Sequence, residues 1–276
     1  MMASLNKTTM IVEWNAHMFS RDQERYPFYP EAAYQPEASR LSPDPLADYL
    51  GRMDTMGIDR AVLVQPEPYG DDHSLILDCL YRGGERFKAT CLFLPRDPDP
   101  ASKLTDLVQA QPRIIALRFH AHRGKEMYLD SFDDLAVRDL WQRAGELGLV
   151  IELHIGPNYA QQVGRAVRDY PDFPVLIDHL AEPAMGTAQE YDDVLALGEY
   201  ENVVMKLSGL PHCSNMPEPH LDLKALVTRV ARAFGPDRLA WSSGSPHLIV
   251  DSLLDGWSEA ERRKVKGLNL ARLAAF

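Results

Sequence analysis

The sequence predicts an α/β fold in which eight parallel strands, with helices between them, close into a single (β/α)8 barrel of the TIM type. Short apolar segments alternate with segments of helical periodicity along the whole chain. The apolar segments are nearly continuous hydrophobic runs, which is typical of parallel strands that are buried on both faces. The 276 residues match the usual length of such a barrel, so one catalytic domain over residues 1–276 is expected. A doubly wound sheet is the alternative.

Eight apolar runs are the expected strands, and most of them are followed by a segment with the helical period. The strands are expected at residues 10–15, 60–65, 87–94, 114–119, 150–154, 175–179, 203–207 and 239–243. The clearest amphipathic helices are expected at residues 45–56, 101–111, 133–147, 159–170, 221–234 and 258–275. The sequence shows no internal repeat or linker that would mark a second domain.

One connection is much longer than the others. Residues 18–42 separate the first strand from the first helix and include the aromatic, proline-rich stretches 25–30 (RYPFYP) and 34–36 (YQP). A long loop in a compact domain usually has a function, and a loop after a strand lies on the C-terminal face of a barrel. We therefore expect this loop to act as a lid or a pocket wall, with a packed irregular segment or an oligomer contact as the alternative.

The composition excludes several classes of partner. The formal net charge is −11, so nucleic acid and anionic membranes are expected to be repelled. The three cysteines form no CxxC pair and indicate neither a disulfide framework nor a thiolate zinc site. The N-terminus lacks the apolar region of a signal peptide, and no run of about 18 apolar residues occurs. A cytoplasmic protein is expected, and a homo-oligomer is compatible with the sequence.

Polar residues end most of the expected strands. In a β/α barrel the catalytic side chains project from the C-terminal ends of the strands, so these residues are the candidates for a site. The strand period of two places Glu13, Asn15 and His17 on one face of the first strand. The later strands end in Gln65, Arg118, His120, Glu152, His154, Asp178, His179, Lys206, Ser208, Ser242, Ser243 and Gly244.

Three of the histidines, His17, His154 and His179, are expected to meet Arg118 and Lys206 at one mouth of the barrel. A single histidine at a strand end is more often a satisfied structural group than a catalyst. Burying so many polar groups together costs several kcal/mol unless each is paired or solvated. A shared polar pocket is therefore the economical interpretation.

Short motifs run through nearly the whole chain in a fixed order. They read IVEWNAH (11–17), RYP (25–27), LVQP (63–66) with YG (69–70), LRF (117–119), LH (153–154), IDHL (177–180) with Pro183, MKLSG (205–209), PH (246–247) and Asn269. Together they resemble the amidohydrolase superfamily, and in particular its amidohydrolase-2 branch of pyrone-dicarboxylate and sugar-acid lactonases. The first motif is similar to the Asp-x-His-x-His opening of these barrels. The resemblance implies an enzyme that acts on a small carboxylated cyclic metabolite.

Two positions depart from the family pattern. Asn15 stands where the first strand normally has a histidine, and Gly244 stands where the eighth strand normally has a catalytic aspartate. In metal-dependent members the family's histidine and aspartate at these two positions help to ligate a divalent ion. Of the ligand set that the resemblance implies, this chain therefore keeps only His17, His154 and His179. Three histidines can hold zinc in principle, but asparagine is a poor zinc ligand, and the lactonase branch is thought to work without metal. Neither a metal nor a cofactor is expected.

Opening a lactone requires a group that polarises the carbonyl, a base for water and a group that holds carboxylates. We expect His17, His154 and His179 to be catalytic, because imidazole titrates near neutral pH and can donate to an oxyanion. Arg118 is expected to bind a carboxylate, as is Arg123, for which a solvated loop charge is the alternative. The expected substrate-binding residues are Asn15, Gln65, Tyr69, Arg118, Arg123, Tyr159, Lys206, Ser208, Ser243 and His247.

Three of the candidate residues have an alternative interpretation. Lys206 lends positive charge to the pocket or forms a structural ion pair with Glu13 or Glu152. Tyr159 is a hydroxyl donor or a packing residue at the start of a helix. Cys213, beside a histidine on the loop after the seventh strand, is considered as a thiolate nucleophile.

The expected function is metal-independent hydrolysis of a carboxylated lactone or a similar small ring. Without the aspartate, a histidine must activate the water, or the reaction must need no water. A lactone isomerase or lyase meets the second condition, because the nucleophile of an isomerase is already part of the substrate. A metal-dependent amidohydrolase or decarboxylase, and an impaired barrel that only binds a ligand, are further alternatives. The sequence contains no nucleophile elbow, dinucleotide fingerprint or P-loop.

Overall fold

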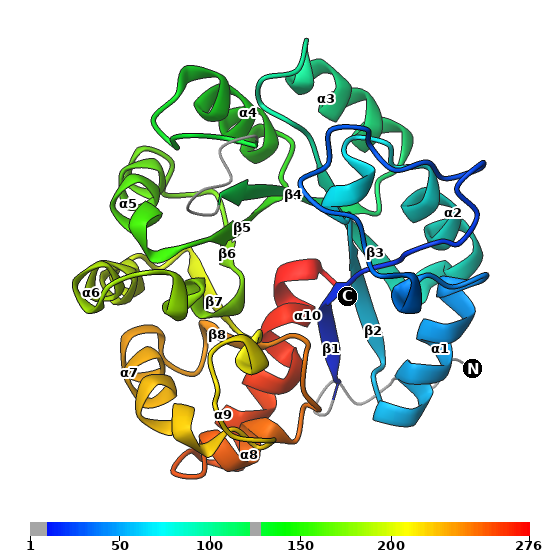
Figure 1. Cartoon of the computed structure of the whole chain (residues 1–276). Helices are drawn as coiled ribbons and strands as arrows, with labels where there is room; N and C mark the ends of the chain where they lie inside the picture. The colour runs from blue at the N-terminus through cyan, green and yellow to red at the C-terminus, as the bar shows by residue number, and fades with distance from the viewer. Residues whose placement is uncertain (1–9, 122–127) are drawn as a thin grey trace, which may run out of the picture.

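The computed structural model describes residues 10–121 and 128–276 and shows a nearly closed barrel of eight parallel strands surrounded by helices (Figure 1). Each strand pairs with the next one along the chain, which confirms the predicted barrel over the doubly wound sheet. The strands are β1 Val12–Ala16, β2 Arg60–Val64, β3 Phe87–Leu92, β4 Ile114–Ala121, β5 Val150–Ile155, β6 Val175–Ile177, β7 Val203–Leu207 and β8 Leu239–Trp241.

The helices fall at the expected places, with three additions. They are α1 Pro45–Met56, α2 Ser74–Gly83, α3 Pro100–Ala110, α4 Leu135–Glu146, α5 Ala160–Asp169, α6 Ala188–Ala196, α7 Lys224–Phe234, α8 Ile249–Leu253, α9 Glu259–Arg263 and α10 Asn269–Ala274. α2, α6 and α8 were not among the helices expected from periodicity. None of the helices in the described ranges is long and apolar enough to cross a membrane.

The helix expected over residues 258–275 is present as a continuous run of α9, a π-helical stretch Lys264–Leu268 and α10. Gly267 allows a close approach at this stretch, because a Cβ atom there would lie 2.1 Å from the carbonyl oxygen of Met10. The chain thus passes directly against the start of β1. α10 packs against β1 and β8, and Leu270 and Ala274 join the apolar cluster of inward-facing strand residues. This packing closes the N-terminal end of the barrel.

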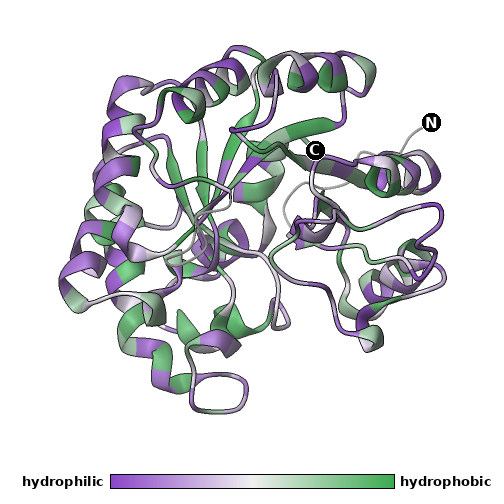
Figure 2. Cartoon of the chain, turned by 45° about the horizontal axis from the view of Figure 1, so that its top comes forward, coloured by the Kyte–Doolittle hydropathy of each residue, from purple (hydrophilic) through white to green (hydrophobic). Residues whose placement is uncertain are grey.

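Hydrophobic residues concentrate on the central strands, whereas the surrounding helices carry both kinds of residue (Figure 2). A larger core fills the layer between strands and helices, and a smaller one fills the barrel interior. α1 shows how the sequence sets the ends of a helix. Asp44 accepts a hydrogen bond from the backbone N–H of Ala47, Pro45 occupies the first turn, and Gly57 ends the helix at φ 65°.

Side chains bridge the seam between the first and last strands. The hydroxyl of Ser242 donates to the carbonyl of Trp14, and Asn15 Nδ2 donates to Ser243 Oγ at 3.1 Å. The register of β1 against β2 shifts between Trp14 and Ala16, so Asn15 lies at an irregular point of the strand. Asn15 therefore helps to join β1 to the end of β8.

Candidate active site

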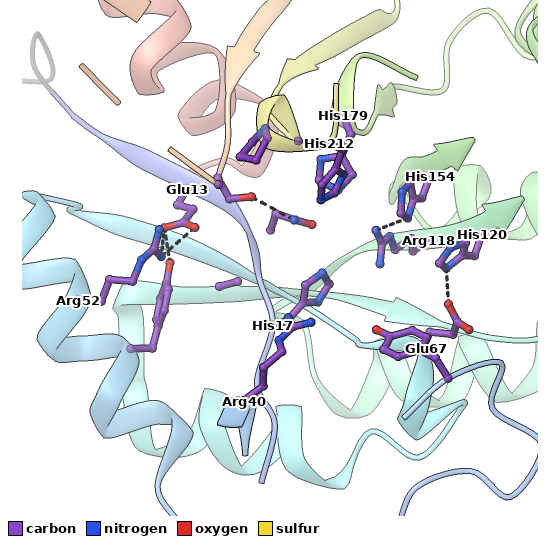
Figure 3. A pocket seen from close by; sticks show the side chains of 18 residues that line it. Glu13, His17, Arg40, Arg52, Glu67, Arg118, His120, His154, His179 and His212 are labelled. Atoms are coloured by element: carbon purple, nitrogen blue, oxygen red, sulfur yellow. Dashed lines mark hydrogen bonds and ion pairs between the residues drawn. The ribbon is translucent and has the colours of Figure 1, made fainter. Parts of the chain in front are cut away.

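A cavity of about 540 Å³ opens at the C-terminal ends of the strands (Figure 3). His17, Arg118, His154 and His179 are far apart in the sequence but share this cavity, as the strand-end pattern predicted. Its lining within the described ranges consists of Glu13, Asn15, Ala16, His17, Tyr34, Arg40, Tyr49, Arg52, Glu67, Arg118, His120, His154, His179, Gly209, Pro211, His212, Ser243 and Gly244.

A network of buried ion pairs lies inside the barrel, adjoining the cavity. Lys206 Nζ is 2.6 Å from Glu152 Oε1 and 2.6 Å from Asp178 Oδ1, and none of the three side chains is exposed. Glu152 Oε2 also accepts hydrogen bonds from Trp14 Nε1 at 2.9 Å and from Thr90 Oγ1 at 2.7 Å. Lys206 is thus held in an ion pair with Glu152, as the structural alternative predicted, and it does not line the cavity.

Arg118 connects this network to the cavity. Its Nε and Nη2 donate to Asp178 Oδ2 at 3.2 Å and 2.8 Å, and Nη2 also donates to His154 Nδ1 at 3.0 Å. Burial alone would raise the pKa of Asp178, but the charges of Lys206 and Arg118 hold the pKa below its usual value. The remaining guanidinium nitrogen, Nη1, makes none of these contacts, and Arg118 lines the cavity. Nη1 can therefore donate a hydrogen bond to an anionic ligand in the cavity.

Both ring nitrogens of His154 have a partner. Arg118 donates to Nδ1, and Nε2 lies 3.0 Å from Glu182 Oε1. A guanidinium can only donate, so Nδ1 must accept, and Nε2–H then donates to the carboxylate. These contacts select the neutral tautomer with its proton on Nε2, and they leave the ring no free lone pair.

A left-handed turn follows β6 and positions two of the site residues. His179, Leu180, Ala181 and Glu182 have φ angles of 51°, 56°, 58° and 47°. For L-residues this conformation costs roughly 1–2 kcal/mol each, so the surrounding structure must hold the turn in place. The turn places His179 in the cavity wall, where its Nδ1 lies 2.9 Å from Ser208 Oγ, and it brings Glu182 to His154.

His17 and His179 are neutral acceptors at physiological pH. The Nδ1–H of His17 donates to the carbonyl of Val64 at 2.9 Å, which leaves Nε2 as an acceptor. Burial, together with the nearby charge of Arg118, lowers the pKa of His17 to about 3. Burial also lowers the pKa of His179 to about 3, although Asp178 opposes this shift. The Nε2 lone pair of His17 can therefore accept a hydrogen bond from a water molecule or a substrate hydroxyl.

We expect Gly209→Ala to lower kcat/KM by roughly tenfold to 100-fold, because small displacements of an active group have effects of this size. A Cβ atom at Gly209 would lie 2.7 Å from Cβ and 2.8 Å from Cγ of His179, so the imidazole would have to move away from Ser208. Gly57→Ala is the control, since Gly57 has a similar φ of 65° but nothing within 4 Å of its Cβ position. Steady-state kinetics and thermal unfolding of both variants separate displacement of His179 from backbone strain. Equal activity of the two variants would contradict the prediction.

Two of the expected substrate-binding residues hold the loop after β2. Gln65 Nε2 donates to the carbonyls of Gly70 and Asp72 at 3.1 Å and 2.8 Å. The hydroxyl of Tyr69 accepts a hydrogen bond from the backbone N–H of Ser20 at 2.9 Å. Both side chains are buried and neither lines the cavity. Through Ser20, Tyr69 also fixes the start of the long loop of residues 18–42.

Tyr159 and His247 also lie outside the lining of the cavity. The ring of Tyr159 packs edge-on against Phe132 at 5.9 Å, and the ring of His247 packs edge-on against Trp241 at 5.9 Å. These contacts favour packing roles in the absence of substrate. Arg123 lies outside the described residues.

Asn15, Ser208 and Ser243 lie at the site as expected. Asn15 and Ser243 line the cavity and bond to each other, and Ser208 bonds to His179. For Cys213, burial raises the pKa to about 11, which disfavours the thiolate considered from the sequence.

Several residues of the site were missed by the sequence-based prediction. The loop of residues 18–42 contributes Tyr34 and Arg40 to the cavity wall, and its aromatic composition was the only signal. Glu182 precedes the Pro183 of a recognised motif, but nothing in the sequence shows the left-handed turn. His212 lies 3.5 Å from Glu182 through Nδ1 and was noticed only as the neighbour of Cys213.

A second acid–histidine contact lies at the other side of the cavity. His120 Nδ1 is 3.2 Å from Glu67 Oε2 (Figure 3). The ring of Tyr128 stacks on His120 at 5.2 Å. His120 was identified as a strand-end residue but was not chosen for the site. Glu67 lies in a Pro-Glu-Pro turn after β2, where no periodic pattern singles it out.

The donor atoms at the site do not fit a divalent metal ion. His154, Asp178 and His179 each offer a donor atom, and these atoms lie within 4.8 Å of one another. However, His154 has no free lone pair, and both oxygens of Asp178 are held by Arg118 and Lys206. A metal ligand must present a free lone pair, and two cations beside Asp178 would repel a third.

Residues 12–275 match the model of the family Amidohydro_2, described as amidohydrolase. The chain is 27% identical over 225 residues to a 4-sulfomuconolactone hydrolase of Rhizobium radiobacter, covering 80% of this chain and 71% of the relative. It is 26% identical over 267 residues to a 4-sulfomuconolactone hydrolase of Hydrogenophaga intermedia, covering 90% and 84%.

Solved structures share the same fold. A candidate 2-pyrone-4,6-dicarboxylic acid hydrolase of Acinetobacter baumannii, crystallised with citric acid, has a TM-score of 0.78 and 20% identity, covering 96% of this chain and 99% of its own. A candidate enzyme of the same kind from Pseudomonas putida has a TM-score of 0.77 and 24% identity, covering 97% and 98%. An amidohydrolase of Burkholderia multivorans with bound zinc has a TM-score of 0.73 and 19% identity, covering 97% and 99%.

Proposed function

The chain belongs to the amidohydrolase family, and from this premise we propose that it hydrolyses a small carboxylated lactone without a metal ion. The observation that supports the proposal best is the convergence of three imidazoles and Arg118 on one cavity. The relatives named as hydrolases of 4-sulfomuconolactone, a ring with anionic substituents, support hydrolysis of a lactone.

In the proposed mechanism, Arg118 binds an anionic group of the substrate through Nη1. Nη1 can take this role because the contacts with Asp178 and His154 use Nε and Nη2. A charge-assisted hydrogen bond of this kind is roughly twice as strong as a neutral one, and it orients the ring in the cavity. The lactone carbonyl then lies among the imidazoles, where a histidine activates the attacking water.

His17 and His179 are proposed to position this water and the substrate hydroxyls. Each is neutral at pH 7, because burial keeps its pKa near 3. His154 is proposed to orient Arg118, because its Nδ1 accepts from Nη2. All three histidines thus have a proposed role at the site, but the role of His154 differs from that of His17 and His179.

Hydrolysis in ¹⁸O-labelled water tests the reaction class. The substrates to be used are 4-sulfomuconolactone, 2-pyrone-4,6-dicarboxylate and a panel of sugar-acid lactones. We expect mass spectrometry to show one ¹⁸O atom in the ring-opened product. The protein is also treated with EDTA, and elemental analysis confirms that metal is absent. We expect the rate of this metal-free protein to equal that of the untreated protein. Turnover without label would instead indicate a lactone isomerase or lyase. Loss of activity on chelation, restored by zinc, would contradict metal independence.

A further inference from the structure

Gly244 leaves an open space in the cavity wall at the end of β8. Its φ is +87°, and a Cβ atom there would have the backbone nitrogen of Gly209 at 3.8 Å and Cδ of Pro211 at 3.9 Å as its nearest neighbours. A side chain at position 244 would therefore extend beside the loop that follows β7. That loop carries His212, and both residues line the cavity.

The imidazoles of His17, His154 and His179 are poorly suited to take a proton from water. His154 has no free lone pair, since Arg118 and Glu182 occupy both of its nitrogens. For His17 and His179, burial lowers the pKa of each to about 3. The efficiency of a general base increases as its pKa approaches the working pH, so these two groups are weak bases at pH 7.

His212 has the features that these groups lack. Its Nδ1 faces the buried carboxylate of Glu182 at 3.5 Å, while 60% of its side chain is exposed. The contact with Glu182 raises the pKa of His212, and partial burial opposes the shift. His179, whose ring centre is 5.8 Å away, is the other titratable group facing it. A carboxylate that orients Nδ1–H leaves Nε2 as an unprotonated acceptor.

Glu182 also joins His212 to the rest of the site. Its Oε1 lies 3.0 Å from His154 Nε2 and 3.5 Å from His212 Nδ1, so one carboxylate serves both rings. The chain of contacts runs from Asp178 through Arg118, His154 and Glu182 to His212. Figure 3 shows its link between Arg118 and His154. The strained turn of residues 179–182 is what brings Glu182 to this point, which gives the strain a functional explanation.

We propose that His212, oriented by Glu182, is the general base that activates water in place of the missing side chain at position 244. This inference rests on the proposed function. Nε2 of His212 takes one proton from water as the water oxygen bonds to the lactone carbonyl carbon and the carbonyl π electrons move to its oxygen. The intermediate then collapses, the ring C–O bond breaks, and His212 returns the proton to the leaving oxygen. The net change is the addition of one water.

His212→Asn tests the base directly. We expect kcat/KM at the pH optimum to fall by about 10²–10³-fold, as is typical when a general base is removed, and imidazole added to the buffer to restore part of the rate. His220→Asn is the matched control, because His220 lies on the same loop with its Nδ1 on the carbonyl of Met216 and does not line the cavity. Its kcat/KM should stay within about twofold of the wild type, in the range of a variant without a catalytic role.

Glu182→Gln provides a readout that a merely structural role would not change. Activity should fall at low pH as His212 becomes protonated, and this acid limb should move to lower pH in Glu182→Gln, because the neutral amide no longer stabilises the imidazolium. NMR titration of the His212 ring should show the same downward shift of its pKa. An unmoved acid limb, or His212→Asn within about threefold of the wild type, would overturn the inference alone. A wild-type protein that opens no lactone would overturn the proposed function as well.

Discussion

Lys206→Met should destabilise the protein by roughly 3–5 kcal/mol, which is the cost of leaving a buried charge without its partner. Lys206 contacts both Glu152 and Asp178 at 2.6 Å, and all three side chains are fully buried. Asp178 would keep Arg118, but Glu152 would keep only the uncharged donors Trp14 and Thr90. Methionine fills the space of the lysine stem, so most of the loss reflects charge. Chemical denaturation at pH 8 measures it.

The loss should depend on pH in a defined direction. Burial already raises the pKa of Glu152, and Lys206 opposes this shift, so removing Lys206 raises the pKa further. A carboxyl group whose pKa is raised in the folded state destabilises that state as the pH rises above its unfolded pKa of about 4.3. The deficit of Lys206→Met relative to the wild type should therefore be small near pH 4 and should grow toward pH 8.

Two further variants make this prediction specific. Lys224→Met removes an exposed ion pair with Asp255 and should change the stability by no more than about 0.5 kcal/mol. Adding Glu152→Gln to Lys206→Met should recover part of the loss, because no unpaired carboxylate would remain at position 152. The loss of stability in Lys206→Met could instead be no larger than that in Lys224→Met. That result would show that the ion pairs of Lys206 are not buried as the structure indicates.

The barrel could be predicted from the sequence because its signals are local. Continuous apolar runs gave all eight strands, and helix α1 was predicted with its observed bounds, Pro45–Met56. The expected C-terminal helix is present, but its π-helical stretch Lys264–Leu268 was not predicted. Gly267 in that stretch lies against Met10, and no periodicity within residues 258–275 reports this contact between distant parts of the chain. The cytoplasmic location and the homo-oligomer remain predictions from the sequence.

The site could be predicted only where strand position decides it. His154 and Arg118 follow from the ends of β5 and β4, and the motif around β6 singled out His179. Glu182 and His212 depend on a left-handed turn and on a loop whose course the sequence does not reveal. The sequence also could not show which histidine acts as a base and which positions another group. That distinction depends on which ring nitrogens already have a hydrogen-bond partner.

Arg118→Lys should lower kcat/KM by about 10²–10³-fold, mainly through KM, if Arg118 binds the anionic group of the substrate. A lysine keeps the positive charge but has a single nitrogen and no planar fork. It cannot contact Asp178 Oδ2, His154 Nδ1 and a substrate carboxylate as Nε, Nη2 and Nη1 can. Removing one partner of a buried, hydrogen-bonded charge typically costs 2–5 kcal/mol, which is consistent with this range.

Arg138→Lys is the matched control for the loss of a fork. Arg138 also uses three nitrogens, which contact the carbonyl of Phe132 and the carboxylates of Asp169 and Asp133, but it lies on α4 outside the cavity. Its kcat/KM should match the wild type even if its stability falls slightly.

A neutral analogue of the substrate separates the two tasks of Arg118. If Nη1 binds a carboxylate, replacing that carboxylate with an amide should raise KM for the wild type and should remove most of the difference between wild type and Arg118→Lys. If Arg118 only orients His154 and Asp178, the variant should lose kcat equally on both substrates, because the damage would not depend on the substrate's charge. A uniform loss in kcat would therefore contradict the anion-binding role and retain only the positioning one. The two outcomes differ because Arg118 contacts the buried network through Nε and Nη2 and also lines the cavity.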